Sequence, residues 1–467
     1  MVTMEEEQLV APASEPPVGV WAPAHRRLTL GLVLTITLVA FEALAISTVM
    51  PVVADDLGGL HLYGWVFSGF FLANLVGTVV AGSMADRRGT APPFVLGLAL
   101  FAVGLVIGGL APSMGVLVAG RVAQGIGAGA IPAVAYATVG RAYPPSLRPR
   151  IFAVFSSAWV IPGLIGPAAA SAIASASSWR FVFLALLPFV AIAAVILVPS
   201  LTRTADVAVA AEEGDAEGSW SRGLVLAASV GAVFVAVSGV PIVLAVVLVL
   251  VGVPVAVRTF VRLVPAGTLQ LRPGLPAAVL VRGMLTFAFF GTDAYVSLSL
   301  LEVRDQPTWV AGAALTACTL CWTAAAWVQE RRISVVGPRR LVAIGLGIVA
   351  VAIGLMYGLL GAMPIPLAIL VWGVGGFGIG LAYSPLSVIV LGLAEPGREG
   401  ARSASLQLSD TLGVALGTGT VGAIVAFGDA NGWATRSSLE LAFAITLAVA
   451  LLGLAATRRL PDHLPST

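Results

Sequence analysis

Apolar runs of roughly 20 residues recur along the chain of 467 residues, separated by short polar stretches. A helix needs about 20 mostly apolar residues to cross a hydrocarbon core of about 30 Å, so each run predicts one membrane-spanning helix. The runs fall into a group of six, a pair, and a second group of six: 28–50, 63–85, 92–111, 113–140, 150–174 and 179–199; then 223–239 and 241–257; then 278–301, 309–329, 341–362, 365–393, 403–427 and 437–457. The pattern predicts an all-α polytopic membrane protein with 14 spans.

The two groups of six predict a duplicated architecture. Blocks 28–199 and 278–458 have similar lengths and the same rhythm of loops, which favours two pseudo-symmetric six-helix bundles with a binding site where they meet near the membrane midplane. The remaining segments are an N-terminal tail at 1–27, an acidic linker at 200–222, an inserted helix pair at 223–257, a linker at 258–277 and a tail at 459–467. Gly and Pro in the inserted pair leave open a re-entrant hairpin, which would reduce the count to 12 spans.

The distribution of arginine predicts the orientation. Of 25 basic residues, all arginine, 21 fall in ends and connections on the side of the N-terminus, Arg282 among them. Three fall on the opposite side, Arg180, Arg304 and Arg436, and Arg121 lies within a span. Positive residues concentrate in cytoplasmic loops, so both termini are expected in the cytoplasm. The lysine-free, Ala- and Gly-rich composition favours a GC-rich bacterium, hence a bacterial inner membrane.

Composition narrows the function. The chain is 58% hydrophobic and 10% charged, against about 25% charged residues in soluble proteins, which excludes a soluble enzyme on a membrane anchor. Its three histidines are scattered in loops and tails, and the sequence shows no metal, phosphate-loop or nucleophile pattern. A membrane enzyme is therefore a distant alternative to a transporter. We expect no cofactor, no nucleic-acid partner and a monomer.

Four charges fall within apolar spans: Glu42, Arg121, Asp293 and Asp410. A charge at the bilayer centre costs about 2.5–3.5 kcal/mol or more, so each points to a function or to a buried partner. At 1.5 Å per residue the first three lie about 12 Å from the helix ends opposite the termini, so they can share one layer. Glu42 and Asp293 also occupy matching places in the two blocks.

We predict that these residues provide the proton-coupling site in a substrate cavity. Desolvation favours a protonated carboxylate and a nearby arginine favours an ionised one, a balance that suits proton loading and release. The alternative for Glu42 is a structural ion pair with Arg121. Asp410 could instead face a vestibule or accept hydrogen bonds within the bundle. Aromatic residues available for the cavity wall are Phe41, Phe67, Phe70, Phe71, Trp159, Phe287, Phe289, Phe290, Tyr295 and Tyr383.

Residues 82–90, between the second and third spans, resemble the loop signature of the major facilitator superfamily. Gly82, Asp86, Arg87 and Gly89 match it, while its closing basic pair is missing. By this resemblance, Asp86 and Arg87 form a conformational latch at the cytoplasmic face.

Two further spans resemble signatures of the same superfamily. In the fourth, Arg121, Gln124 and Gly125 share one helix face and match the second signature, whose arginine is implicated in proton relay in proton-driven members. Gly125 and Gly129 form a small-xxx-small pair for close helix packing. The fifth span contains Gly163, Gly166 and Pro167, a partial match to the antiporter signature.

The resemblance extends to the fourteen-span branch of drug:proton antiporters. It implies export of amphipathic small molecules by alternating access, driven by the proton gradient. A transporter of one lipid or metabolite is the nearest alternative, and Gly166 and Pro167 argue against uptake symport.

Overall fold

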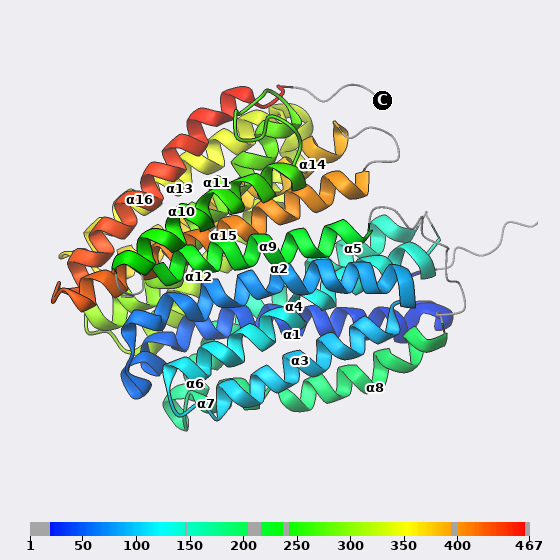
Figure 1. Cartoon of the computed structure of the whole chain (residues 1–467), viewed down its shortest axis with the longest axis horizontal. Helices are drawn as coiled ribbons and strands as arrows, with labels where there is room; N and C mark the ends of the chain where they lie inside the picture. Colours follow the sequence, from blue (N-terminus) through cyan, green and yellow to red (C-terminus); the bar gives the residue numbers. More distant parts are fainter. Residues whose placement is uncertain (1–18, 145–146, 204–215, 237–241, 394–398, 463–467) are drawn as a thin grey trace, which may run out of the picture.

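The computed structural model describes residues 19–144, 147–203, 216–236, 242–393 and 399–462, and these form helices and turns without a strand (Figure 1). The first half contains α1 Pro23–Leu57, η1 Leu60–Leu62, α2 Tyr63–Arg88, α3 Ala91–Gly109, α4 Met114–Ala142, α5 Arg148–Ser157, α6 Val160–Ala176, α7 Arg180–Leu184 and α8 Leu187–Arg203. The insert contains α9 Ala216–Ala236 and α10 Ile242–Leu263. The second half contains α11 Leu275–Leu298, η3 Ser299–Val303, α12 Thr308–Val336, α13 Pro338–Leu360, α14 Ile365–Gly392, α15 Glu399–Ala430, α16 Thr435–Ala456 and η4 Thr457–Arg459.

The helix lengths account for 12 to 14 crossings. Within the described residues, 12 helices are long and apolar enough to cross a membrane, and Val160–Ala176 and Ser221–Ala236 are shorter apolar helices. The first of these, α6, completes the fifth span together with α5. The second belongs to α9, whose 21 residues extend about 31 Å. The predicted fold class, two six-helix bundles with an inserted pair, is confirmed.

Some helix boundaries differ from the expected ones. Helix α9 begins at Ala216, within the linker expected at 200–222, and α10 continues to Leu263. Helix α11 begins at Leu275 rather than at 278. A helix can continue beyond the hydrocarbon core with polar residues, which hydropathy does not register. We call the end of the bundle where α1 begins and α16 ends the termini face, and the opposite end the far face.

The fifth span is broken at Ala158 and Trp159, between α5 and α6. Pro162 has no N–H, so it cannot bond the carbonyl of Ala158 four residues earlier. The hydroxyl of Thr37 on α1 donates to this carbonyl at 3.3 Å. Such repair by a neighbouring helix is what permits a broken helix inside a membrane.

Glycines set the spacing of helices in both halves. A Cβ on Gly125 or Gly129 of α4 would overlap backbone atoms of α2. A Cβ on Gly376 or Gly380 of α14 would overlap backbone atoms of α12 in the same way. The expected close approach at Gly125 and Gly129 is therefore present, and the second half repeats it 251 residues later.

The two halves meet along two seams toward the far face. In the first, α2 lies against α15 so closely that a Cβ on Gly64 would be 2.5 Å from the Cα of Gly422. Beside it, the Tyr63 hydroxyl on α2 donates to the Ala294 carbonyl on α11 at 3.4 Å. In the second seam, α6 packs on α12, where a Cβ on Gly312 would be 3.1 Å from the Pro167 carbonyl oxygen.

The insert lies against the first seam. Figure 1 shows α9 between α2 and α15, and α9 contacts both of these helices. The ring of Phe234 on α9 occupies the space that a Cβ on Gly419 of α15 would fill, and it meets Trp65 of α2 edge to face at 6.0 Å. Helix α10 packs on α9, and its apolar side chains, such as Leu250, remain exposed for lipid.

The glycine contact at the first seam predicts a conformational effect. Gly64→Val places methyl groups against the backbone at Gly422, so the two halves should separate at the far face. Spin labels at His61→Cys and Asn431→Cys, with the native cysteines replaced, would report a longer or broader distance distribution. Gly347→Val is the control, because a Cβ there meets no atom within 4 Å. An unchanged distribution for Gly64→Val would contradict the close contact.

Candidate transport site

Glu42 and Arg121 form a buried ion pair between α1 and α4. Arg121 Nη1 donates to Glu42 Oε1. Glu42 is 0% exposed and Arg121 is 2% exposed. Arg121 Nε donates to the Val66 carbonyl of α2 at 3.1 Å, and its guanidinium lies over the Phe70 ring with 4.0 Å to the ring centre. One arginine therefore joins α1, α2 and α4 through an ion pair, a hydrogen bond and a cation–π contact.

Two polar atoms around this ion pair remain without a hydrogen bond in the described structure. Arg121 Nη1 also donates to Gln124 Oε1 at 3.0 Å, so Gln124 supports the guanidinium. The amide nitrogen Nε2 of Gln124 and the second carboxylate oxygen Oε2 of Glu42 are buried and have no partner among the described residues. Unsatisfied buried polar atoms are costly and often mark a functional position. The second oxygen of Glu42 therefore takes no part in the ion pair.

Asp293 on α11 has a matching partner in the second half, on α14. Trp372 Nε1 donates to Asp293 Oδ1 at 2.8 Å, and the Trp372 ring stacks on Phe289 at 5.2 Å between ring centres. Glu42 and Arg121 are 79 residues apart in the chain, and so are Asp293 and Trp372. An indole thus occupies the place of the guanidinium, so Asp293 accepts a hydrogen bond where Glu42 has a counter-charge.

Helix α2 contacts the surroundings of both carboxylates. Its Val66 carbonyl receives the Arg121 hydrogen bond, and the next residue, Phe67, has its ring centre 6.4 Å from that of Tyr295 on α11. Tyr295 follows Asp293 by two residues. The described contacts contain no direct interaction between Glu42 and Asp293; each carboxylate is held within its own half.

Asp410 belongs to a different buried cluster, which includes Arg282. Arg282 Nε donates to Asp410 Oδ1 at 2.7 Å, and Arg282 Nη1 donates to the Tyr383 carbonyl at 2.6 Å. The Tyr383 hydroxyl donates to Asp410 Oδ2 at 3.1 Å. These contacts join α11, α14 and α15.

The assignment of Arg282 to a cytoplasmic helix end was wrong: it lies seven residues inside α11 and is 3% exposed. For Asp410, the interpretation as a hydrogen-bond acceptor within the bundle describes its contacts.

Among the described residues of the first half, the Arg282 cluster has no counterpart. The equivalent positions, 251 residues earlier, are Gly31 for Arg282 and Trp159 for Asp410. Trp159 lies at the break between α5 and α6, whereas α15 continues through Asp410. The duplicated halves therefore differ in construction toward the termini face.

The loop signature lies at the end of α2. The Asp86 side chain is outside the described residues, and Arg87 is exposed. Gly89 ends the helix with φ +80°, a left-handed value that suits glycine, and its N–H donates to the Ala85 carbonyl at 3.0 Å. Arg141 of α4 donates to the same carbonyl at 3.1 Å. This arginine fixes the helix end and was missed by the sequence analysis. The role of Asp86 and Arg87 as a latch stays a prediction.

The antiporter-like signature lies in α6 at the second seam. Pro167 has no N–H for the carbonyl of Gly163, so one internal hydrogen bond of the helix is missing there. A Cβ on Gly163 would overlap the Thr319 side chain of α12, and Gly166 faces the Phe41 and Leu44 side chains of α1. The signature thus gives α6 small side chains and one missing internal hydrogen bond where the halves touch. Within the described ranges, no group of three or more His, Cys, Asp or Glu side chains could hold a metal ion.

Comparison with known families agrees with this architecture. Residues 32–336 match the family model described as Major Facilitator Superfamily, which is more than half of the chain. The chain belongs to the major facilitator superfamily.

Proteins similar to this chain include bacterial efflux transporters. A probable multidrug-efflux transporter of Mycobacterium tuberculosis is 28% identical over 434 residues, which cover 88% of this chain and 90% of that protein. A multidrug efflux pump of Staphylococcus aureus is 29% identical over 169 residues, which cover 36% of this chain and 38% of that protein.

Solved structures share the fold. A human organic anion transporter aligns with a TM-score of 0.61 at 18% identity, covering 95% of this chain and 100% of that chain. A POT family transporter in complex with 5-aminolevulinic acid aligns with a TM-score of 0.68 at 14% identity, covering 92% and 96% of the two chains.

The Glu42–Arg121 pair predicts strong thermodynamic coupling. Removing one partner of a buried pair costs about 3–5 kcal/mol because the other charge is left unpaired. Arg121→Gln should therefore lower the Tm in detergent more than the double variant Glu42→Gln/Arg121→Gln does. Additive losses in this double-mutant cycle would contradict a direct pair.

The Arg282 cluster predicts unequal effects of its two partners. Asp410→Asn leaves Arg282 without its counter-charge and should lower the Tm strongly. Tyr383→Phe removes one hydroxyl and keeps the ring that contacts Arg282, so the loss should be about 1 kcal/mol. Equal Tm losses for the two variants would show that charge does not govern the cluster.

Proposed function

We propose that this chain is a proton-coupled antiporter that exports amphipathic small molecules, including organic cations, from the cytoplasm. The observation that carries the proposal is Glu42, a fully buried carboxylate with one oxygen held by Arg121 and the other without a partner in the described part of the chain. A proton can bind the free oxygen, and Arg121 supplies the charge balance after the proton leaves. The resemblance of the chain to multidrug-efflux transporters supports export of drug-like compounds.

The charges of the two carboxylate sites support cationic substrates. Glu42 and Arg121 cancel when both are ionised, whereas the structure shows no ion pair for Asp293 among the described residues. The formal charge of the three side chains is then −1. A cation of charge +1 that approaches Asp293 would neutralise it, and so would a proton. For cationic substrates, this competition at Asp293 adds to the proton exchange at Glu42.

The positions of the contacts support a path toward the termini face. The halves touch near the far face at Gly64 and Gly422, and residues 291–298 of α11 are all buried. On the same helix, Met284, Phe287 and Phe290 lie closer to the termini face and are partly exposed. With the termini in the cytoplasm, as the arginine distribution predicts, this conformation would receive substrate from the cytoplasm and later release it on the far side.

The proposal predicts a carboxylate-dependent, pH-driven flux. In liposomes with an imposed pH gradient, the wild-type protein should move several unrelated lipophilic cations against the proton flow. Glu42→Gln should abolish this flux, because a neutral amide cannot exchange a proton. Asp293→Asn should reduce cation transport more than transport of neutral compounds. Glu302→Gln, an exposed acidic residue of η3, is the matched control and should behave like the wild type.

The same assay separates the alternatives. Normal pH-driven flux in the Glu42→Gln protein would end the proposal for Glu42. Flux of one metabolite or of a lipid, with no movement of the varied cations, would redirect the function to a dedicated exporter. Uptake of substrate together with protons would replace antiport by symport.

A further inference from the structure

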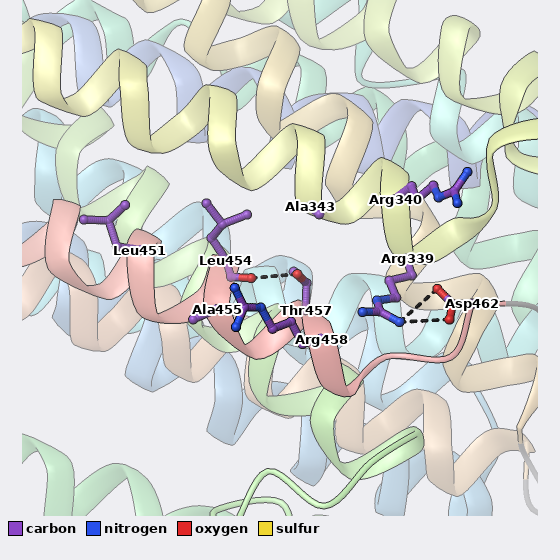
Figure 2. A pocket seen from close by; sticks show the side chains of 9 residues that line it. All are labelled: Arg339, Arg340, Ala343, Leu451, Leu454, Ala455, Thr457, Arg458 and Asp462. Carbon is purple, nitrogen blue, oxygen red and sulfur yellow. Dashed lines mark hydrogen bonds and ion pairs between the residues drawn. The ribbon is translucent and has the colours of Figure 1, made fainter.

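A groove lies between α13 and α16 at the termini face, away from the carboxylate sites. It has a volume of about 600 Å³ and is formed by the start of α13 and the last turns of α16 with the residues that follow it. Figure 2 shows the residues that line it. None of them belongs to the Glu42, Asp293 or Arg282 clusters, so the groove has no part in the proposed transport chemistry.

The mouth of the groove carries an excess of positive charge. Arg339, Arg340 and Arg458 line it, with Asp462 as the one acidic residue of the lining. Arg339 Nη1 donates to both carboxylate oxygens of Asp462 at 2.9 Å. Figure 2 shows Arg458 lying along α16 beside Ala455, and Arg340 turned away from the pair at the rim. After the pair is cancelled, a formal charge of +2 remains.

The local backbone adds to this positive potential. Helix α13 begins at Pro338, and its first turn contains Arg339 and Arg340 but no acidic residue. The N-terminus of a helix carries a partial positive charge, so arginines there are unfavourable unless an anion lies nearby. Asp462 provides one negative charge. The groove therefore favours a further anion.

The inner wall of the groove is apolar. Ala343 of α13 and Leu451, Leu454 and Ala455 of α16 continue the groove from the arginines toward the membrane interior, and Leu451 is 50% exposed. A free inorganic anion would use the arginines but not this wall. A molecule with an anionic head and hydrocarbon chains fits both parts, and basic pockets between helices at a membrane surface favour such lipids.

We infer that this groove, called here the α13–α16 groove, binds an anionic phospholipid. The phosphate lies between Arg458 and the Arg339–Asp462 pair, with Arg340 adding positive charge at the rim, and an acyl chain follows Leu454 and Ala343 into the leaflet. The lipid thereby stabilises the contact of α13 with α16. The inference concerns a site separate from the transport path, so it stands or fails independently of the proposed function.

Lipid binding to the delipidated full-length protein in detergent tests the inference. Native mass spectrometry should show tighter binding of dioleoyl phosphatidylglycerol than of dioleoyl phosphatidylcholine. Arg340→Gln/Arg458→Gln, which keeps the Arg339–Asp462 pair, should weaken phosphatidylglycerol binding about tenfold or more. Arg258→Gln/Arg262→Gln is the matched control, because it removes two exposed arginines of α10 at the same face. Equal losses in both double variants would overturn the inference in favour of non-specific surface charge.

Two further variants test the remaining features of the site. Ala343→Phe fills the apolar wall without changing charge, so it should weaken phosphatidylglycerol binding; unchanged binding would contradict an acyl chain in the groove. Asp462→Asn removes the competing carboxylate, so it should strengthen phosphatidylglycerol binding even if it lowers the Tm. Weaker binding in this variant would overturn the assigned phosphate position. Full displacement of the lipid by inorganic phosphate would show a site for a small anion instead.

Discussion

The ion pair between Glu42 and Arg121 constrains how the first half can pack. A guanidinium buried to 2% exposure in an apolar bundle needs a partner for its charge and acceptors for its N–H groups. It finds them on α1, on the α2 backbone and in Gln124 one turn later. The glycines that follow on α4 bring α2 close enough for its backbone carbonyl to take part. The burial of the Arg121 charge therefore depends on the close spacing of α2 and α4.

The second half retains this geometry and changes its chemistry. The 79-residue spacing of donor and acceptor and the glycine pattern both recur, so the backbone scaffold is duplicated. An indole N–H can hold Asp293 in place but carries no charge to compensate it. The Arg282 cluster places a separate ion pair toward the termini face, where the first half has a broken helix instead. Two similar scaffolds thus present different electrostatics to the space between them.

The fold and the intramembrane acids could be predicted from sequence, because apolar runs and isolated charges in them are direct physical signals. Arg282 could not be placed correctly: it lies near an expected span boundary, where an arginine is ordinary. Trp372 gave no signal by itself, since tryptophan is common in apolar helices. The constant offset of 251 residues from Arg121 would have identified it. Pro162 accompanies the break in the fifth span, but the Thr37 hydroxyl that satisfies the freed Ala158 carbonyl lies on another helix, which a linear pattern does not reveal.

The position of α9 has a consequence for molecules that are dissolved in the bilayer. One seam between the halves, that of α2 and α15, lies behind α9, with Phe234 filling a notch beside Gly419. The other seam, that of α6 and α12, has exposed apolar side chains such as Ile165 and Leu320. A hydrophobic compound that diffuses in the plane of the membrane therefore meets a seam covered by α9 on one flank and an uncovered seam on the other. The two flanks of the protein therefore differ in how they face the surrounding lipid.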